Sequence, residues 1–261
     1  MNSLKKIITA ILALAMLLSL CACGSKDSAG IKTVEAGKLH MATNAAFPPY
    51  EMVKDDGSFE GIDVEIAEKI AEKLGLELVV DDMDFGSVIA SVKTGKSDIA
   101  MAGLTITDER KQNVDFTDTY ATGKQVIIVK EGSDIKSADD LAGHKIGTQE
   151  STTGYAYCSA PIEEGGFGEE NVIAYTNGAT AVQALVEGKV DCVVIDNEPA
   201  QKYVAANPGL IILETPFISE EYAIGVAKDN AALRDAVNNA LKELIADGTV
   251  KSIIDKYIKA D

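Results

Sequence analysis

The sequence has no tryptophan, and its 261 residues include only two histidines, four cysteines and six prolines. So few histidines and cysteines argue against a His- or Cys-rich metal site, and we expect neither a metal nor a cofactor. Positive charge is also scarce, since 24 Lys and Arg stand against 41 Asp and Glu and give a formal net charge of −17. Such a surface repels polymers of phosphates, so we expect no nucleic-acid partner.

What remains is the composition of an ordinary globular protein, with 46% hydrophobic and 25% charged residues. A disordered or low-complexity chain would have fewer apolar residues and more Gly and Pro. The length suits one large domain or two lobes of roughly 100 residues each.

The first 22 residues are typical of a signal peptide. Lys5 and Lys6 precede an almost entirely apolar run over 7–22, which is short for a membrane-spanning helix. The run ends in the sequence LCAC, which resembles a bacterial lipobox and implies cleavage before Cys23 and attachment of lipid to it; an uncleaved anchor helix is the alternative. Residues 23–36 then form a flexible tether, so we expect an extracytoplasmic protein that its lipid anchors to the cell membrane.

Two cysteines, Cys158 and Cys192, remain in the mature chain. An oxidising compartment permits a disulfide between them, but a core of this size does not need one. We favour two buried free thiols and keep the disulfide as the alternative.

Strands and helices alternate along the mature chain. Asp63 is placed to cap an amphipathic helix that Gly75 ends, and a second helix follows over 87–93. The expected strands are 38–42, 76–80 (a buried strand) and 98–102. This alternation predicts the α/β class, with a mainly parallel sheet that helices cover on both faces.

The segment 87–103 is echoed 93 residues downstream, at 180–196. Each copy has an apolar helix, a Gly-Lys-x-Asp turn and an apolar strand, which ends at Gly103 in the first copy and at Asp196 in the second. A duplicated α/β lobe explains the echo economically, and two unrelated units of the same kind are the alternative.

Two extended segments, 123–131 and 217–228, connect the expected lobes. A pair of extended crossings forms a natural hinge, because each sheet stays rigid while the crossings twist. The expected boundaries are 37–123 with 221–261 for lobe 1, and 124–220, with the hinge strands, for lobe 2.

Polar residues gather in the loops that follow strands, where open parallel sheets bind their ligands. The loops are 43–51, 102–110, 149–154 and 195–197. Arg110 offers a guanidinium that can fork onto a carboxylate, unless it pairs on the surface with Asp108 or Glu109. Asp196 offers a carboxylate suited to an ammonium, unless it caps the next helix.

Further groups in these loops fit the same kind of ligand. The Thr105 hydroxyl can accept a proton from an ammonium. Residues 151–154 begin a helix whose free N–H groups favour an anion, with simple capping as the alternative. Phe47 and Phe85 supply apolar walls or fill the core. Together these groups describe a receptor for a zwitterion.

Motifs along nearly the whole mature chain resemble those of the solute-binding proteins of the polar-amino-acid ABC-transporter family. They are TNAAFPPYE (43–51), GIDVEIAEKIAEKLG (61–75), AGLTITDERKQNVDFTDTY (102–120), whose part from 103 onward is the most specific, and the loop 149–154. The resemblance implies a type II periplasmic-binding-protein fold of two lobes joined by a two-strand hinge. Such a protein closes on a free amino acid and passes it, as a monomer, to an ABC permease and its ATPase.

The resemblance also implies how the ligand is held. Arg110 and the Thr153 amide would bind the carboxylate, while Asp196, the Gly103 carbonyl and the Thr105 hydroxyl would bind the ammonium. The residues around the ligand side chain would be Asn44, Phe47, Phe85, Gln149 and Thr152.

Two of these positions depart from some relatives. Asn44 replaces an acid and Gln149 replaces a lysine, so the side-chain pocket is polar without formal charge. This favours a neutral polar ligand, unless Glu51, Asp84 or Glu150 supplies an acidic wall.

Two other functions fit the same fold, a dehydratase-type enzyme and a ligand-sensing lipoprotein. The sequence has no G-x-S-x-G, H-E-x-x-H or phosphate-loop motif. His40, in a predicted strand, and His144, in a turn, have no evident nucleophile beside them. We therefore expect a binding protein that is not an enzyme; the sensor shares every pocket feature.

Overall fold

The structure is a computed structural model that describes residues 31–213 and 218–259, so the signal peptide expected over 1–22 and the lipid attachment expected at Cys23 lie outside the described residues. From Lys32 onward the chain forms one compact unit. Its strands and helices alternate, and the α/β class with two lobes and a two-strand hinge is confirmed.

One sheet of nine described strands holds the unit together. Its strands are β1 (Lys38–Thr43), β5 (Glu77–Asp82), β6 (Ile99–Ala100), β7 (Val114–Lys130), β8 (Ile146–Gln149), β9 (Val172–Tyr175), β10 (Cys192–Asp196), β11 (Leu210–Ile212) and β12 (Ile218–Ala227). A small antiparallel sheet holds β2 (Ala46–Phe47), β3 (Glu51–Val53) and β4 (Phe59–Glu60).

Helices pack against the large sheet and against the small antiparallel sheet. The α-helices are α2 (Ile62–Leu74), α3 (Phe85–Lys93), α4 (Asp108–Lys111), α5 (Thr153–Ser159), α6 (Gly178–Val186), α7 (Asn197–Ala206), α8 (Ala231–Ala246) and α9 (Thr249–Tyr257). The short 3₁₀ turns are η1 (Ala138–Asp140), η2 (Ile162–Glu164) and η3 (Glu169–Asn171). None of the helices within residues 31–213 and 218–259 is both long and apolar enough to cross a bilayer.

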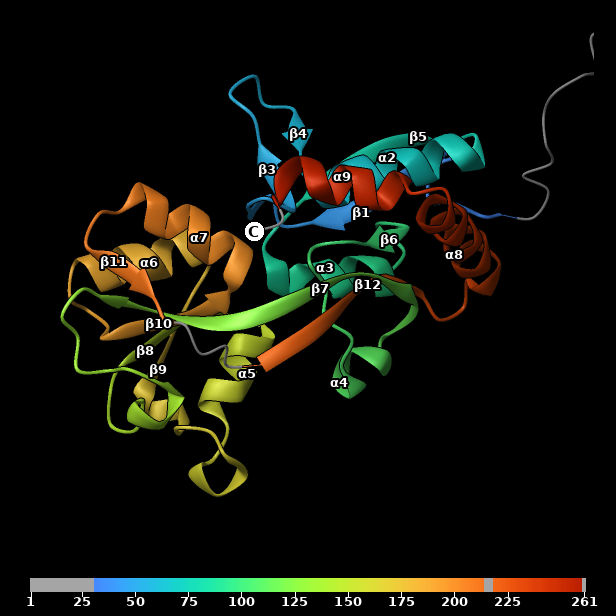
Figure 1. Ribbon diagram of the computed structural model, residues 1–261. Coiled ribbons are helices and arrows are strands. Elements are labelled where there is room, and N and C mark those ends of the chain that lie inside the picture. Colours follow the sequence, from blue (N-terminus) through green and yellow to red (C-terminus); the bar gives the residue numbers. More distant parts are fainter. Residues whose placement is uncertain (1–30, 214–217, 260–261) are drawn as a thin grey trace, which may run out of the picture. The chain divides into compact units, whose positions relative to one another are not determined.

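The strand order is β5-β1-β6-β12-β7-β10-β8-β9, with β11 paired to β7. The blocks at the two ends are parallel, since β1 pairs with β5 and β6, and β8 pairs with β9 and β10. Between them, β7 and β12 form a long antiparallel pair that Figure 1 shows running from one block to the other. We keep the names lobe 1 for the β1 block and lobe 2 for the β8 block; their residue boundaries stay a prediction.

The α2 helix shows where local expectations hold and where one is wrong. It ends as expected at Gly75, which has the left-handed φ of 69° that favours glycine at this position. Asp63, however, makes no capping bond, because its buried carboxylate turns inward and accepts hydrogen bonds from the Gly103 amide and the Tyr120 hydroxyl. The strand expected as buried, β5, lies at the edge of the sheet and is half-buried.

The sequence echo corresponds to two segments with the same local geometry. Gly95 and Gly188 both adopt a left-handed φ, of 68° and 73°. In each copy the backbone amide of the lysine after this glycine donates to a carbonyl of the preceding helix at 2.9 Å. The Asp of each Gly-Lys-x-Asp turn accepts a hydrogen bond of 2.8 Å from a backbone amide, that of His40 in β1 for Asp98 and that of Lys145, just before β8, for Asp191. These shared contacts support an internal repeat.

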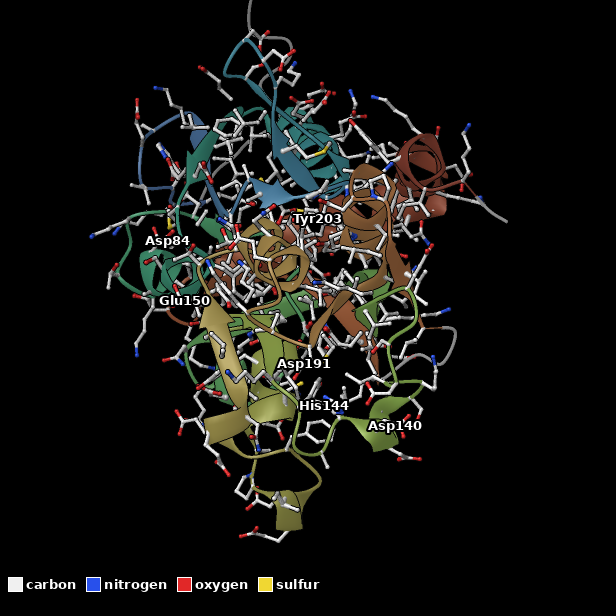
Figure 2. All side chains as sticks on the ribbon, turned by 90° about the vertical axis from the view of Figure 1, so that its left-hand side faces the viewer. Asp84, Asp140, His144, Glu150, Asp191 and Tyr203 are labelled. Atoms are coloured by element: carbon white, nitrogen blue, oxygen red, sulfur yellow. The ribbon has the colours of Figure 1, made fainter. Side chains whose placement is uncertain are left out.

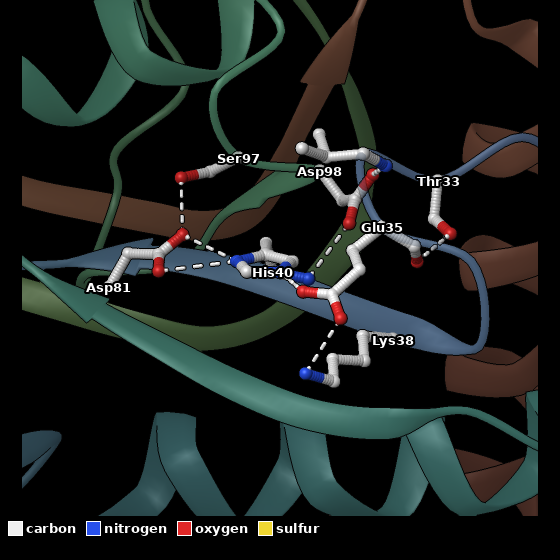
Figure 3. Close-up of polar contacts among 8 residues, drawn as sticks. Thr33, Glu35, Lys38, His40, Asp81, Ser97 and Asp98 are labelled. Carbon is white, nitrogen blue, oxygen red and sulfur yellow. Dashed lines mark hydrogen bonds and ion pairs between the residues drawn. The ribbon is translucent and has the colours of Figure 1, made fainter.

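Asp98, in the first copy, belongs to a polar cluster around β1. Its carboxylate accepts from the amides of Val34 and His40, both at 2.8 Å. Figure 3 shows the His40 ring beside Asp81, with Nδ1 3.2 Å from each carboxylate oxygen. The cluster ties the segment before β1 to the sheet, as expected for a structural histidine.

The core consists of apolar clusters on the sheet faces. One of them encloses Cys158 and Cys192, which are buried and unpaired. Burial raises the pKa of Cys158 to about 12 and that of Cys192 further still, so both stay protonated thiols. The expectation of two buried free thiols is confirmed.

Candidate functional site

All ten residues that the sequence predicted for the ligand site line a single pocket between the lobes. The lining residues are Asn44, Phe47, Glu51, Phe85, Ala102, Gly103, Thr105, Arg110, Gln149, Thr152, Thr153 and Asp196. They come from the carboxyl ends of β1, β5, β6, β8 and β10 and from the segments that follow these strands, because the carboxyl ends of both parallel blocks face the same space.

Arg110 is only 8% exposed, on the four-residue helix α4, which Thr107 caps. Its Nη1 donates to the Thr105 carbonyl at 2.9 Å and its Nη2 to the Ser151 carbonyl at 3.2 Å. The guanidinium carbon lies 5.3 Å from the centre of the Phe85 ring. These partners carry no formal charge, so the buried cation still attracts an anion.

The surface ion pair that was the alternative for Arg110 does not form. Asp108 pairs instead with Lys111 at 3.3 Å. Among the described residues, Arg110 has no carboxylate within ion-pair distance. Burial lowers the pKa of Arg110, but the side chain stays charged at neutral pH because its ordinary pKa is so high.

Asp196 stands at the N-cap position of α7, yet its side chain makes no capping bond. One carboxylate oxygen accepts from Gln125 Nε2 at 2.8 Å and the other from the Tyr222 hydroxyl. Burial raises the pKa of Asp196 to about 7, and the nearby carboxylate of Glu220 raises it as well. The capping alternative therefore fails, and Asp196 is a buried acid that an ammonium would stabilise in its charged form.

Gly103 and Thr105 line the pocket together with these two charged residues. The Gly103 amide donates to Asp63 at 2.8 Å, and its φ of 53° is one that glycine adopts readily. A Cβ there would lie 2.7 Å from the Phe47 ring, so the close approach also requires glycine. The Thr105 hydroxyl donates to Glu220 at 3.1 Å.

The loop after β8 supplies the lobe 2 wall. Thr152 caps α5, because its hydroxyl accepts from the Tyr155 amide at 3.2 Å and donates to the Gln149 carbonyl at 2.7 Å. Simple capping, the alternative for this loop, thus holds for Thr152. The α5 helix begins at Thr153, which also lines the pocket.

Among the described residues, three hydrogen bonds join the lobes around the pocket besides those that the hinge strands make. Gln149 Nε2 donates to Asn44 Oδ1 at 3.0 Å, and Arg110 makes its bond to Ser151. On α7, the hydroxyl of Tyr203, marked in Figure 2, donates to the Ala46 carbonyl at 3.0 Å. The lobes are therefore in direct contact at the site.

Glu51 is a pocket residue that the sequence offered only as an alternative. It is fully buried, and neither carboxylate oxygen has a hydrogen-bond donor among the described residues. Burial and the neighbouring Asp63 raise the pKa of Glu51 well above its usual range. Asp84 and Glu150, marked in Figure 2, are exposed and do not line this pocket.

The two histidines lie elsewhere. His40 is in the β1 cluster of Figure 3. His144 Nδ1 lies 3.4 Å from an oxygen of Asp191, and Figure 2 marks His144 and Asp191. Within the described part of the chain, no group of three or more His, Cys, Asp and Glu is arranged to hold a metal ion.

A two-lobed fold with a buried cation and a buried acid facing one pocket is typical of solute-binding proteins. Residues 39–260 match the bacterial extracellular solute-binding proteins, family 3, and the chain belongs to this family.

Its relatives match along nearly their whole length. The arginine-binding extracellular protein ArtP of Bacillus subtilis (strain 168) is 32% identical over 263 residues, covering 99% of this chain and 100% of ArtP. The ABC transporter glutamine-binding protein GlnH of the same organism is 34% identical over 275 residues, covering 99% of each. The arginine-, lysine-, histidine-binding protein ArtJ of Geobacillus stearothermophilus aligns in structure with a TM-score of 0.79 at 34% identity, over 86% of this chain and 96% of ArtJ.

Proposed function

We propose that this protein binds a free polar α-amino acid with high affinity outside the cytoplasm and delivers it to an ABC permease and its ATPase. One observation carries the proposal: buried Arg110 and buried Asp196, of opposite charge, line the same pocket from different lobes. Water screens such charges poorly at a buried site, so a zwitterion that satisfies both gains strongly from binding. The names of ArtP and GlnH, an arginine binder and a glutamine binder, support the same class of ligand.

Within the pocket, the ligand carboxylate lies against Arg110 and the Thr153 amide. Its ammonium donates to Asp196, to the Gly103 carbonyl and to the Thr105 hydroxyl. The burial of both charged groups supports this arrangement, and so does the Thr105 hydroxyl, which donates to Glu220 and keeps lone pairs to accept from the ammonium.

The side chain of the ligand occupies the part of the pocket around Asn44 and Gln149, which are hydrogen-bonded to each other. Both are uncharged, which favours a polar side chain that exchanges hydrogen bonds with amides. Glu51 adds a carboxyl group there, which serves a neutral amide while protonated and a cation once ionised.

The protein binds its ligand without changing it. The two lobes, 37–123 with 221–261 and 124–220, move relative to each other about the hinge strands β7 and β12. No observation in the pocket favours the dehydratase or the sensor. Incubation of the purified protein with the amino acid that it binds, followed by mass spectrometry of the small molecule, tests for an enzyme such as a dehydratase. A new product would establish an enzyme.

We also propose that a lipid on Cys23 anchors the protein, as a monomer, to the outer face of the cell membrane or in the periplasm. Mass spectrometry of the N-terminal peptide from membrane-extracted protein should show a diacylglyceryl group on Cys23, and Cys23→Ala should release the protein from membranes. An unmodified peptide that still contains residues 1–22 would contradict the anchor. Sedimentation should give the mass of one chain.

Native mass spectrometry of the protein as purified, followed by calorimetry with all twenty amino acids, tests the proposed function. We expect a retained ligand with the mass of an amino acid, and binding of one polar amino acid or a few. Absence of binding to any of them would contradict the proposal.

A further inference from the structure

Glu220 lies on the hinge strand β12, next to the proposed ammonium site but outside the pocket lining. It is 5% exposed, and its Oε2 accepts two hydrogen bonds, from the Thr105 hydroxyl at 3.1 Å and from Gln125 Nε2 at 3.0 Å. The same amide nitrogen of Gln125 donates to Asp196 at 2.8 Å. One carboxylate therefore connects the two side chains that we place at the ligand ammonium.

The direction of the Thr105 bond decides what this residue offers to the pocket. A hydroxyl has a single hydrogen, and an ionised carboxylate only accepts. Because Thr105 gives its hydrogen to Glu220, only the lone pairs of its oxygen are left for a ligand. An ammonium only donates, so the held hydroxyl matches it and need not reorient on binding.

Gln125, on the other hinge strand, is fixed in the same way. Both hydrogens of its amide are engaged, one by Asp196 and one by Glu220. Asp196 is held from β12 as well, through the Tyr222 hydroxyl. The acceptors for the ammonium are thus oriented from β7 and β12 together.

We propose that Glu220 is a positioning residue for the ligand ammonium: it holds the Thr105 hydroxyl as an acceptor and, through Gln125, orients Asp196. The inference rests on the proposed function and adds to it a residue that the ligand does not touch. Since Glu220 lies on a hinge strand, the ammonium site is complete only when the hinge strands and both lobes have the arrangement described here.

Calorimetry on Glu220→Met, which keeps the length of the side chain and removes its acceptors, tests the proposal. Two probes are used. The first is the amino acid that binds the parent most tightly, chosen from the twenty standard amino acids and cystine. The second is its counterpart with hydrogen in place of the α-ammonium (5-guanidinopentanoate for arginine, glutaramate for glutamine). We expect Glu220→Met to weaken binding of the amino acid at least tenfold and of the counterpart less than threefold. Glu221→Met, an exposed neighbour on the same strand, is the matched control and should change both less than twofold.

Glu220→Gln should restore affinity to within threefold of the parent, because its amide oxygen can accept the same two bonds. In a Thr105→Ala background, Glu220→Met should cost less than it does in the parent, because only the route through Gln125 to Asp196 is left to lose. Circular dichroism checks folding, and Glu220→Ala replaces Glu220→Met if that variant does not fold.

Three results would overturn this inference alone. They are equal losses for the amino acid and its counterpart, an undiminished effect of Glu220→Met without the Thr105 hydroxyl, and no rescue of binding by Glu220→Gln. A parent that binds no amino acid would overturn the proposed function instead.

Discussion

Arg110 is a buried cation whose hydrogen-bond acceptors are two backbone carbonyls, those of Thr105 and Ser151. An arrangement of this kind costs desolvation that no direct ion pair offsets, although the charges of Glu220 and Asp196 act on Arg110 from a greater distance, so an anion in the pocket would complete it. Asp196 is the complementary case, an acid whose donors are the neutral groups of Gln125 and Tyr222. The pocket therefore gains most from a ligand with both charges.

Replacement of Arg110 should be the most damaging single change for binding. Arg110→Ala leaves the ligand carboxylate without its main partner, which costs on the order of 2–5 kcal/mol. Arg110→Lys should recover little, since an ammonium cannot reproduce the forked donors. Calorimetry with the amino acid that the parent binds measures both, and Lys111→Ala on the same short helix is the control. Folded variants that bind within about threefold of the parent, under 1 kcal/mol, would show that the site is misassigned.

Asp196 should make binding depend on pH. Its pKa of about 7 in the ligand-free protein is raised by burial, Glu220 and Glu198, and lowered by the bonds from Tyr222 and Gln125. Below that value Asp196 is protonated, and a ligand ammonium binds best to the ionised form, so binding releases a proton. We expect affinity to rise with pH by up to about tenfold per unit below pH 7 and then to level off.

Calorimetry at pH 6.5 in two buffers of different ionisation enthalpy measures that proton release directly. Asp196→Asn removes the titrating group and should abolish both the release attributable to it and the rise in affinity, while binding more weakly. A parent affinity that is constant between pH 5 and 8 would contradict this role.

Local patterns predicted Arg110 and Asp196, because both follow strands whose apolar runs are plain in the sequence. They did not predict Asp63 as a support for Gly103, since an acid at the start of a helix has the same spacing whether it caps the helix or turns inward. Glu220 gave no signal at all, because the residue that it contacts, Thr105, is 115 positions away.

Among the elements, the paired strands β7 and β12 do most to set the site. Gly123 on β7 lies under the Tyr222 ring of β12, where any Cβ would overlap the ring and its hydroxyl. The close approach lets the Tyr222 hydroxyl reach Asp196. Glycine is therefore required at this point of the hinge because no side chain fits there.

Gly123→Ala should push Tyr222 away from Asp196. We expect a loss of stability of about 1–3 kcal/mol, typical of overpacking, together with weaker amino-acid binding. Urea unfolding and calorimetry measure the two effects, with Thr122→Ala, at an exposed position of the same strand, as the control. Unchanged stability and affinity would mean that Tyr222 does not pack on this glycine in solution.

The order of the elements was predictable where apolar runs and glycines bound them, as for α2 and for the two Gly-Lys-x-Asp turns. The position of β5 at the sheet edge was not, because its apolar residues read as a buried strand when the neighbours are unknown. Pairing between strands is a long-range property, and the sequence of one strand does not contain it.

Apart from the bonds of the hinge strands, three hydrogen bonds among residues 31–213 and 218–259 join the lobes across the pocket, each worth about 0.5–1.5 kcal/mol net. A ligand that bridges Arg110 and the Thr153 amide adds contacts that only the closed arrangement can make, so it shifts the population towards that arrangement. Small-angle scattering should show a smaller radius of gyration at saturating amino acid than without it. An unchanged radius would count against movement about β7 and β12.

Arg110 and Asp196 together make the pocket a site for one zwitterion. Calorimetry with the amino acid that binds most tightly, beside its counterparts lacking either the α-carboxylate or the α-ammonium, tests it most directly. If Arg110 and Asp196 hold the two charges, each counterpart should bind at least about a hundredfold more weakly, roughly 2.7 kcal/mol. Counterparts that bind as tightly as the amino acid itself would show that Arg110 and Asp196 do not hold the two charges of the ligand.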